Sequence, residues 1–291
     1  MFELLSTIFG LSLAVFVIGS MMAMGLSLRM KMIIEPLKNV KLVVLALLGN
    51  FVLVPILAYL IILILPLDEP LEIGLICLAT AAGAPFLPKL AETGKGNMAF
   101  SVGLMVLLMI VTIIFVPLVL PLLLQGVEVD PREIAQSLIV MMLIPLGIGL
   151  FIKARYEETA AHLQSIFAQA SNLALMALIV LGVVLNFQSM IALIGSRGIL
   201  AAVVFILGSL GIGLALGGSD SGIRTVMGVG TGQRNVSAAM VVVGANFGPE
   251  VLTFVIVCAL IMLVLLMPLA GELGKRAQGK GNGGPTQAPA A

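Results

Sequence analysis

Apolar residues run along this chain in nine long stretches, separated by short polar segments. A helix needs about 20 apolar residues to cross the hydrocarbon core of a bilayer. The nine stretches lie at residues 5–27, 41–65, 72–92, 97–124, 133–153, 165–187, 198–217, 222–246 and 251–271. The pattern therefore predicts an all-α polytopic membrane protein with about nine transmembrane helices.

Charged residues alternate between the two sides of this arrangement. The loops on one side, together with the C-terminal tail, carry the basic residues Arg29, Lys31, Lys38, Lys41, Lys89, Lys95, Lys153, Arg155, Lys275, Arg276 and Lys280. The loops on the other side carry the acidic residues Asp68, Glu69, Glu72, Glu128, Asp130 and Glu133. Because Lys and Arg collect in cytoplasmic loops, we expect the N-terminus outside and the C-terminus inside.

Both ends of the chain differ from the spans between them. The first 27 residues include Glu3 and an apolar run longer than that of a signal peptide, so we interpret them as a retained first helix. Residues 275–291 are rich in Gly, Pro, Gln and Lys and are expected to form a disordered cytoplasmic tail. Residues 1–274 are expected to form one transmembrane transporter domain.

Two of the nine stretches contain residues that disfavour a continuous helix. The third carries Ala82-Gly83-Ala84-Pro85 followed by Pro88, and a helix through both prolines would lose several kcal/mol. The eighth carries three glycines at alternate positions, Gly228, Gly230 and Gly232, followed by Gln233, Arg234 and Asn235. Transporter folds place their binding sites where helices break near the membrane midplane, so these two breaks predict a site.

The two interrupted stretches occupy matching positions in the chain. Stretches 1 to 4 align with stretches 6 to 9, and each set has its break in the third member. Since the two sets begin on opposite sides of the membrane, we expect residues 1–124 and 133–271 to contain inverted repeats, the architecture of a secondary transporter. The alternative is that glycine and proline merely permit close helix packing or a kink.

Composition supports a membrane protein and excludes several other classes. Charged residues are 10% of the chain and apolar residues 60%, against about 25% and 45 to 50% in soluble domains. The net charge of +1 gives no basic surface for nucleic acid. Cys77 and Cys258 lie inside apolar runs, where we expect them to act as small hydrophobic residues.

One charged residue falls at mid-membrane depth. Arg234 lies about twelve residues from each end of its stretch, where an arginine costs about 2.5 to 3.5 kcal/mol and marks a functional site by default. Its planar fork of donors suits a carboxylate, sulfate or phosphate, so an anionic substrate is one expected partner. The alternative is that backbone carbonyls freed at the Pro85 break cap the guanidinium and so join the two broken helices.

Further polar groups lie at a similar depth, namely Asn50, Thr231, Gln233 and Asn235. Individually, each such group is more often a helix-to-helix hydrogen bond than a ligand. His162 lies in a charged loop, and the predicted spans contain no Ser/His/Asp, paired-carboxylate or Cys/His cluster, so no enzyme activity is expected. Neither a metal site nor a resident cofactor is expected.

At these residues the sequence resembles the bile acid:sodium symporter family. The resemblance runs over nearly all of residues 12–272. Its strongest pieces are Gly49-Asn50-Phe51-Val52-Leu53-Val54-Pro55, Ala81-Ala82-Gly83-Ala84-Pro85 leading to Lys95-Gly96-Asn97-Met98-Ala99-Phe100-Ser101, and Gly232-Gln233-Arg234-Asn235. It implies a core domain with two broken, crossing helices, a separate panel domain, and alternating access coupled to two sodium ions.

The chain departs from the family pattern at the residues that the resemblance implies for sodium. Ala84-Pro85 stands where the family has Ser-Asn, and Gly230 replaces the glutamate shared between the sodium sites. Arg234 replaces a glutamine, and Asn50 matches another glutamine but is shorter. A buried guanidinium repels a nearby cation, so we predict that the usual sodium sites are lost or altered, with the guanidinium standing in for the ion or attracting an anion.

Together these observations predict a secondary transporter of small organic anions, bile-acid-like or carboxylate, in the cytoplasmic membrane. The expected site lies between the two breaks and comprises Arg234, Asn235, Gln233, Thr231, Asn50, Gly230, Ala84 and Pro85. The expected partners are the anion and the lipid bilayer. The alternative functions are a ligand-binding membrane sensor on the same fold, without coupled transport, and a passive channel.

Overall fold

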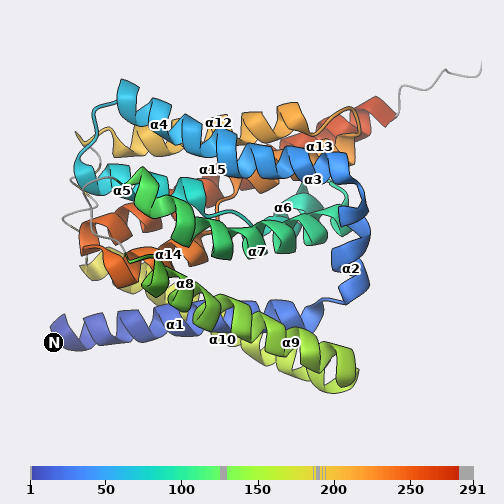
Figure 1. The fold of residues 1–291 in the computed structure, drawn as a ribbon, viewed down its shortest axis with the longest axis horizontal. Coiled ribbons are helices and arrows are strands. Elements are labelled where there is room, and N and C mark those ends of the chain that lie inside the picture. Colours follow the sequence, from blue (N-terminus) through green and yellow to red (C-terminus); the bar gives the residue numbers. More distant parts are fainter. Residues whose placement is uncertain are drawn as a thin grey trace, which may run out of the picture.

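The computed structural model describes residues 2–124, 130–185, 187, 191, 193 and 195–281. Within these residues every regular element is a helix, which confirms the predicted all-α class (Figure 1). The helices are α1 (Phe2–Ser27), α2 (Met30–Ile34), η1 (Glu35–Lys38), α3 (Val40–Leu48), η2 (Gly49–Leu53), α4 (Val54–Ile64), α5 (Glu69–Thr80), α6 (Leu87–Thr93), α7 (Met98–Leu123), α8 (Pro131–Leu138), η3 (Ile139–Leu143), α9 (Ile144–Arg155), α10 (Glu157–Leu185), α12 (Gly198–Leu216), α13 (Ser221–Gly232), α14 (Val236–Asn246) and α15 (Pro249–Gly281).

Seven continuous helices in the described residues are long and apolar enough to cross a membrane. They are Thr7–Ser27, Val40–Ile64, Met98–Leu123, Pro131–Arg155, Glu157–Gly182, Gly198–Leu216 and Pro249–Ala277. Two of them contain a π-helical turn, η2 and η3, that leads into a proline, Pro55 and Pro145. The seven coincide with seven of the nine predicted stretches, so the chain is a multi-pass membrane protein.

The other two predicted stretches are each a pair of short helices. α5 ends at Thr80 and α6 begins at Leu87, so the first break lies at the predicted Ala82 to Pro85. α13 ends at Gly232 and α14 begins at Val236, so the second break spans Gln233, Arg234 and Asn235. The count of nine crossings and the orientation stay predictions.

The second break is shorter than the sequence predicts, and the expectation of a weakened helix from Gly228 onward is wrong. α13 is a regular helix through all three glycines. A Cβ atom at Gly228 would lie 2.6 Å from the Leu214 side chain, and one at Gly232 would lie 3.2 Å from that of Leu266. These glycines therefore permit close packing on α12 and α15, which is the alternative interpretation of the glycine pattern.

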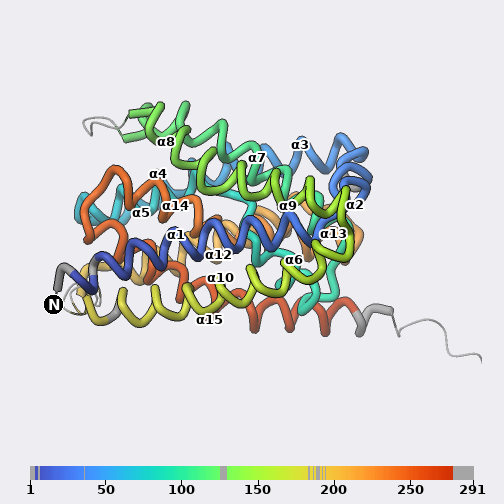
Figure 2. The backbone as a smooth tube through the Cα atoms, turned by 90° about the horizontal axis from the view of Figure 1, so that it is seen from below, coloured from blue at the N-terminus to red at the C-terminus, as the bar shows by residue number. Residues whose placement is uncertain are grey.

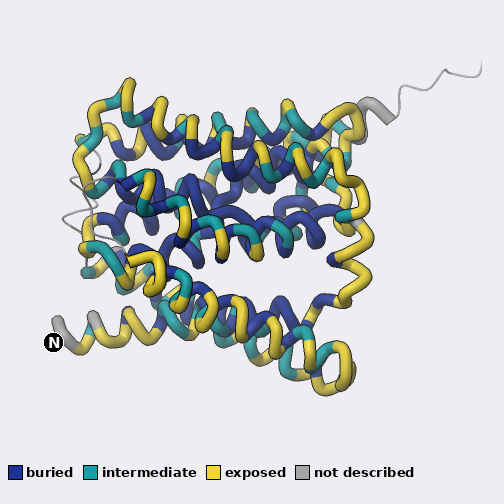
Figure 3. The backbone as a smooth tube through the Cα atoms, in the orientation of Figure 1, coloured by how far each residue is buried: buried dark blue, intermediate teal, exposed yellow. Residues whose placement is uncertain are grey.

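The helices form two groups (Figure 1), and Figure 2 shows the molecule from the side of α1, α9 and α10. α1 packs along α9 and α10, and we call these three helices the panel. The core group consists of α3–α7 and α12–α15, in which α4 packs on α12, α12 on α13, and α5 on α15. Buried residues are concentrated in the broken helices of the core group, whereas the outer faces of α4 and the panel are exposed (Figure 3). Cys77 and Cys258 are both buried and free.

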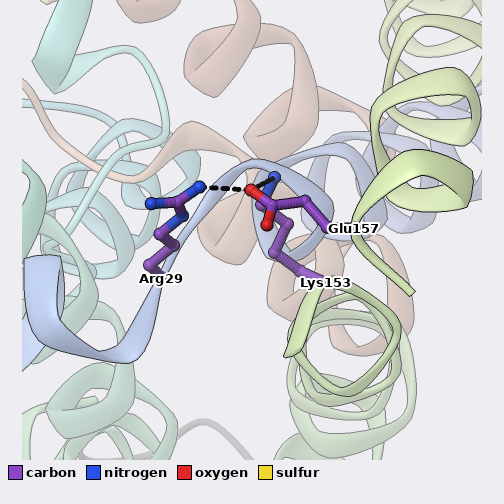
Figure 4. A network of polar contacts seen from close by, with 3 residues as sticks. All are labelled: Arg29, Lys153 and Glu157. Carbon is purple, nitrogen blue, oxygen red and sulfur yellow. Dashed lines mark hydrogen bonds and ion pairs between the residues drawn. The ribbon is translucent and has the colours of Figure 1, made fainter. Parts of the chain in front are cut away.

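A polar contact lies at one end of the panel (Figure 4). Arg29, which follows α1, donates to Glu157 at the start of α10, and Lys153 of α9 lies 3.4 Å from the same carboxylate oxygen. Arg29 and Glu157 are well exposed, so their ion pair contributes little to stability. It links all three panel helices beside the short connection through α2 to the core group.

The C-terminal helix continues past the predicted start of the tail. α15 extends to Gly281 and includes Lys275 and Arg276. The remaining part of the expected tail, 282–291, lies outside the described residues. Helix α15 therefore protrudes beyond the rest of the core group at this end (Figure 1).

The backbone of the first break requires a glycine at position 83. This residue has φ +78°, and a Cβ atom there would lie 2.2 Å from the backbone nitrogen of Met109 on α7. We expect Gly83→Ala to destabilise the protein by about 1 to 3 kcal/mol, because backbone strain and overlap add. Thermal unfolding in detergent measures this as a lower midpoint.

Gly211→Ala is the matched control, because a Cβ atom at Gly211 on α12 meets no atom within 4 Å. That variant should unfold at the wild-type temperature or slightly above it. Equal midpoints for the two variants would contradict the geometry of the first break.

Candidate functional site

The two breaks are joined directly through Asn235. Its backbone N–H donates to Ala81 O at 2.9 Å, and its Nδ2 donates to Ala82 O at 3.2 Å and to Gly83 O at 3.1 Å. Its Oδ1 accepts from Ala238 N at 3.0 Å and so caps the N-terminus of α14. Around this junction α5 lies beside α14, and α6 lies beside α13. The two broken helices therefore cross, and one asparagine fixes the crossing.

Thr112 of α7 supports the first break from the other side. Its hydroxyl accepts from Ala82 N at 2.9 Å and donates to Ala82 O at 3.0 Å. A hydroxyl can do both at once, so Thr112 replaces two helical hydrogen bonds that the break removes. Sequence reasoning missed this residue, although Thr112 alone is polar in the otherwise apolar run of residues 102–124.

The Arg234 side chain lies in the crossing and is fully buried. Nε donates to Leu78 O at 3.0 Å. Nη1 donates to Asn50 Oδ1 at 2.7 Å and to Thr231 O at 3.3 Å. Nη2 donates to Ala79 O at 2.8 Å and to Asn50 O at 3.4 Å. A guanidinium has five N–H donors, so all of them are used within the protein.

Three of these acceptors belong to the ends of helices. The last four carbonyls of a helix have no intrahelical partner, and Leu78 and Ala79 lie in the last turn of α5, as Thr231 does in α13. The C-terminal end of a helix also carries a partial negative charge, which a cation stabilises. Arg234 therefore caps two helix C-termini that point at the same place.

The other two acceptors come from Asn50 in the π-helical turn η2. Val54 N donates to Gly49 O, one residue further back than in an α-helix. The next donor in that register would be Pro55, which has no N–H, and this leaves Asn50 O free for the guanidinium. The Asn50 amide also donates from Nδ2 to Ala46 O at 3.0 Å and to Thr231 Oγ1 at 3.2 Å. Because Pro55 has no N–H, the carbonyl oxygen of Asn50 is available as an acceptor for Arg234.

The predicted capping of Arg234 is correct in kind and differs in its acceptors. The carbonyls come from the end of α5, Leu78 and Ala79, and not from the residues next to Pro85. The break itself is held by Asn235 and Thr112. Because every guanidinium donor has a protein acceptor, the fork has none left for direct contact with an anion in this conformation.

Gly230 lies on α13 next to two leucines of the core group. A Cβ atom there would lie 3.1 Å from the Leu87 side chain and 3.5 Å from that of Leu104. The space beside Gly230 is therefore occupied by apolar side chains. Within the described residues no group of three or more His, Cys, Asp or Glu residues could hold a metal ion.

A pocket of about 370 Å³ adjoins the crossing, between the panel and the core group. From the panel α1 and α10 line it, and from the core group the first break, the second break, α14 and α15 do so. The lining residues are Phe16, Ser20, Ala84, Pro85, Phe86, Ser171, Asn172, Leu175, Leu178, Ile179, Gln233, Arg234, Val236, Ser237, Met240, Ile256, Ala259, Leu260 and Leu263. Most are apolar, as in ordinary small-molecule sites.

The predicted site residues divide between the crossing and the pocket. Ala84, Pro85 and Gln233 line the pocket, and Arg234 borders it while its side chain is buried. The pocket lining does not include Asn50, Thr231, Asn235 or Gly230, which belong to the crossing. The single site predicted from the sequence therefore corresponds to two neighbouring features of the structure, the crossing of the broken helices and the pocket.

Three polar side chains of the pocket wall make no hydrogen bond among the described residues, namely the exposed Asn172 and the buried Gln233 and Ser237. The side-chain amide of Gln233 and the hydroxyl of Ser237 belong to residues that are only 9% and 3% exposed. They flank Asn235, so they lie at the N-terminus of α14. The sequence analysis identified Gln233 and missed Ser237. The face of α14 that borders the pocket depends on how the two broken helices pack, which the sequence does not show.

Comparison with known proteins agrees with this architecture. The model of the Sodium Bile acid symporter family matches residues 13–197, which is more than half of the chain. The matched region contains α3 to α10, and therefore Asn50, the first break and most of the panel. A search of curated proteins finds no match.

The capping role of Arg234 predicts a large effect on stability. Arg234→Met removes all five donors and leaves the ends of α5 and α13 uncapped, so we expect a loss of about 3 kcal/mol or more. Arg234→Lys keeps the charge with fewer donors and should fall between methionine and wild type. Thermal unfolding midpoints of the purified variants provide the measurement.

Arg224→Met is the matched control, at an arginine on α13, the helix that precedes the second break. Arg224 is exposed and makes one hydrogen bond, from Nε to Leu214 O at 3.1 Å. Its loss should lower the midpoint only slightly. If Arg234→Met were no less stable than Arg224→Met, the guanidinium would not hold the crossing.

Proposed function

Because this chain belongs to the sodium bile acid symporter family, we propose that it is a secondary transporter that moves small organic anions across the cytoplasmic membrane by alternating access. The observation that carries the proposal is the pocket at the crossing of two broken helices, lined by the panel on one side and the core group on the other. Sites between helix groups at broken helices are typical of secondary transporters.

The chemistry of the pocket favours an amphipathic organic acid, bile-acid-like or a smaller carboxylate. Its walls are mainly aliphatic and aromatic, and Gln233 and Ser237 offer hydrogen bonds at one place. The volume of about 370 Å³ lies at the lower end of the range for small-molecule sites. An apolar body would contact α1, α10 and α15, and a polar group would reach the end of α14.

Two features make the pocket favourable for an anion without a direct contact to an arginine. The buried charge of Arg234 lies at its border, and charges interact strongly where water is excluded. Val236 and Ser237, the first two residues of α14, line the pocket, and the N-terminus of a helix carries a partial positive charge. Both effects favour a carboxylate over a cationic or neutral headgroup.

Alternating access requires the panel and the core group to move relative to each other. Apart from the pocket, their contacts include two glycines: a Cβ atom at Gly182 of α10 would lie 3.2 Å from Ile256, and one at Gly244 of α14 would lie 3.5 Å from Leu13. These contacts involve apolar side chains and not the polar network of the crossing. Such a surface can separate without breaking the hydrogen bonds that fix the broken helices.

We further propose that the usual sodium sites are lost or altered and that Arg234 takes the place of a bound cation. Transporters coordinate sodium with unwound carbonyls and the C-terminal ends of half-helices, and here those groups hold a guanidinium. The neighbouring space at Gly230 is filled by Leu87 and Leu104. A second cation beside the guanidinium would be repelled.

Counterflow in proteoliposomes tests transport and sodium dependence together. We expect labelled cholate, a bile-acid monoanion, to exchange against unlabelled cholate at the same rate in sodium and in N-methylglucamine buffer. Steep sodium dependence would contradict the proposed replacement of sodium and leave transport standing. Cholate that binds without exchanging would instead indicate the sensor function, and unsaturable flux would indicate a channel.

The pocket predicts which substitutions reduce exchange. Gln233→Leu and Ser237→Ala each remove one hydrogen bond to the ligand, so we expect each to reduce cholate counterflow about tenfold. Gln169→Leu is the control, because Gln169 lies on α10 outside the pocket and bonds Ser165. Wild-type exchange in both pocket variants, with unchanged unfolding midpoints, would place the ligand elsewhere.

A further inference from the structure

The buried region of this protein carries an unbalanced positive charge. Among the described residues Arg234 is the one charged residue that is buried, and no described Asp or Glu residue is buried with it. Its five partners are amide and carbonyl oxygens. These dipoles stabilise the guanidinium but cancel none of its charge, so the crossing has a net charge of about +1.

The same charge belongs entirely to the core group. The acceptors of the guanidinium lie on α5, α13 and η2, and the backbone N–H of Arg234 donates to Met262 Sδ on α15 at 3.4 Å. In the described residues no hydrogen bond joins the Arg234 side chain to α1, α9 or α10. Whenever the core group moves against the panel, the charge moves with it.

The adjoining pocket adds no other charge. Apart from Arg234, its lining residues are apolar or uncharged polar. The buried part of the core group therefore carries about +1 when the pocket is empty, and about zero when a monoanion is bound. The difference is the charge of the ligand.

We infer that Arg234 is a fixed counter-charge that makes the buried part of the core group electrically neutral when a monoanion is bound. Movement of the loaded core group is then insensitive to voltage, and only the return of the empty core group depends on voltage. This inference rests on the proposed function. Exchange of one monoanion for another uses only the loaded step and is therefore insensitive to voltage. Net transport includes the empty step, so each cycle moves one negative charge with the substrate.

Voltage steps applied to the ligand-free protein in a sodium-free planar bilayer test the inference without a known substrate. We expect a transient current on each step and an equal, opposite current on return, because the empty core group shifts the charge of Arg234 through the field. A full elementary charge crossing the whole field changes the two-state equilibrium about 50-fold for a tenth of a volt. No transient in the wild-type protein would overturn the inference.

Two variants of Arg234 distinguish the effect of its charge on the transient current from an effect on folding. Arg234→Lys keeps the charge and should keep the transient, and Arg234→Gln should lose it. Arg224→Gln removes an exposed charge from α13, the helix that precedes Arg234, and should leave the transient unchanged. A transient of wild-type size in folded Arg234→Gln would contradict the inference.

Ligand binding gives a second readout if Arg234→Gln does not fold. Cholate, at the concentration that saturates its counterflow, should suppress the wild-type transient, because the loaded core group is neutral. A transient that cholate leaves unchanged would overturn the inference. If cholate exchanges but the ligand-free protein gives no transient current, the counter-charge role of Arg234 is wrong and the transport proposal stands. If the transient current is present but cholate does not exchange, the transport proposal is wrong and the counter-charge role stands.

Discussion

The crossing of the two broken helices depends on the hydrogen bonds that the Arg234 guanidinium donates to the C-terminal ends of α5 and α13. Two half-helices, α5 and α13, end at the same place, and their free carbonyls would repel each other without a cation between them. Arg234 donates to the last turns of both helices and to Asn50. Asn235 and Thr112 then satisfy the backbone of the first break. An irregular backbone can persist inside the membrane because these three side chains leave few of its polar groups unpaired.

The same arrangement explains how a structural residue can influence a ligand that it does not touch. The pocket lies beside the crossing, and Gln233 and Ser237 present free polar groups on either side of Asn235. The positive charge is fixed in the protein by covalent attachment. A sodium ion in the same place would have to bind and leave in each cycle. Under the proposed replacement of sodium by Arg234, the site forms without ion binding.

The sequence predicted those features that leave a local signal. Pro85 and Pro88 marked the first break, and the depth of Arg234 in an apolar stretch marked a buried charge. Features that depend on contacts between distant helices were out of reach. Gly228 and Gly232 gave no indication of the side chains of Leu214 and Leu266 that pack on them. The acceptors for Arg234 likewise required knowledge of where α5 ends relative to α13.

A cryo-electron microscopy map of the protein in lipid nanodiscs, at saturating sodium, tests the central claim most directly. The account predicts density for the Arg234 guanidinium between the carbonyls of Leu78, Ala79 and Thr231 and the Asn50 side chain, and no ion density at the crossing. An arginine side chain turned into the pocket, with an ion coordinated by those carbonyls, would contradict it.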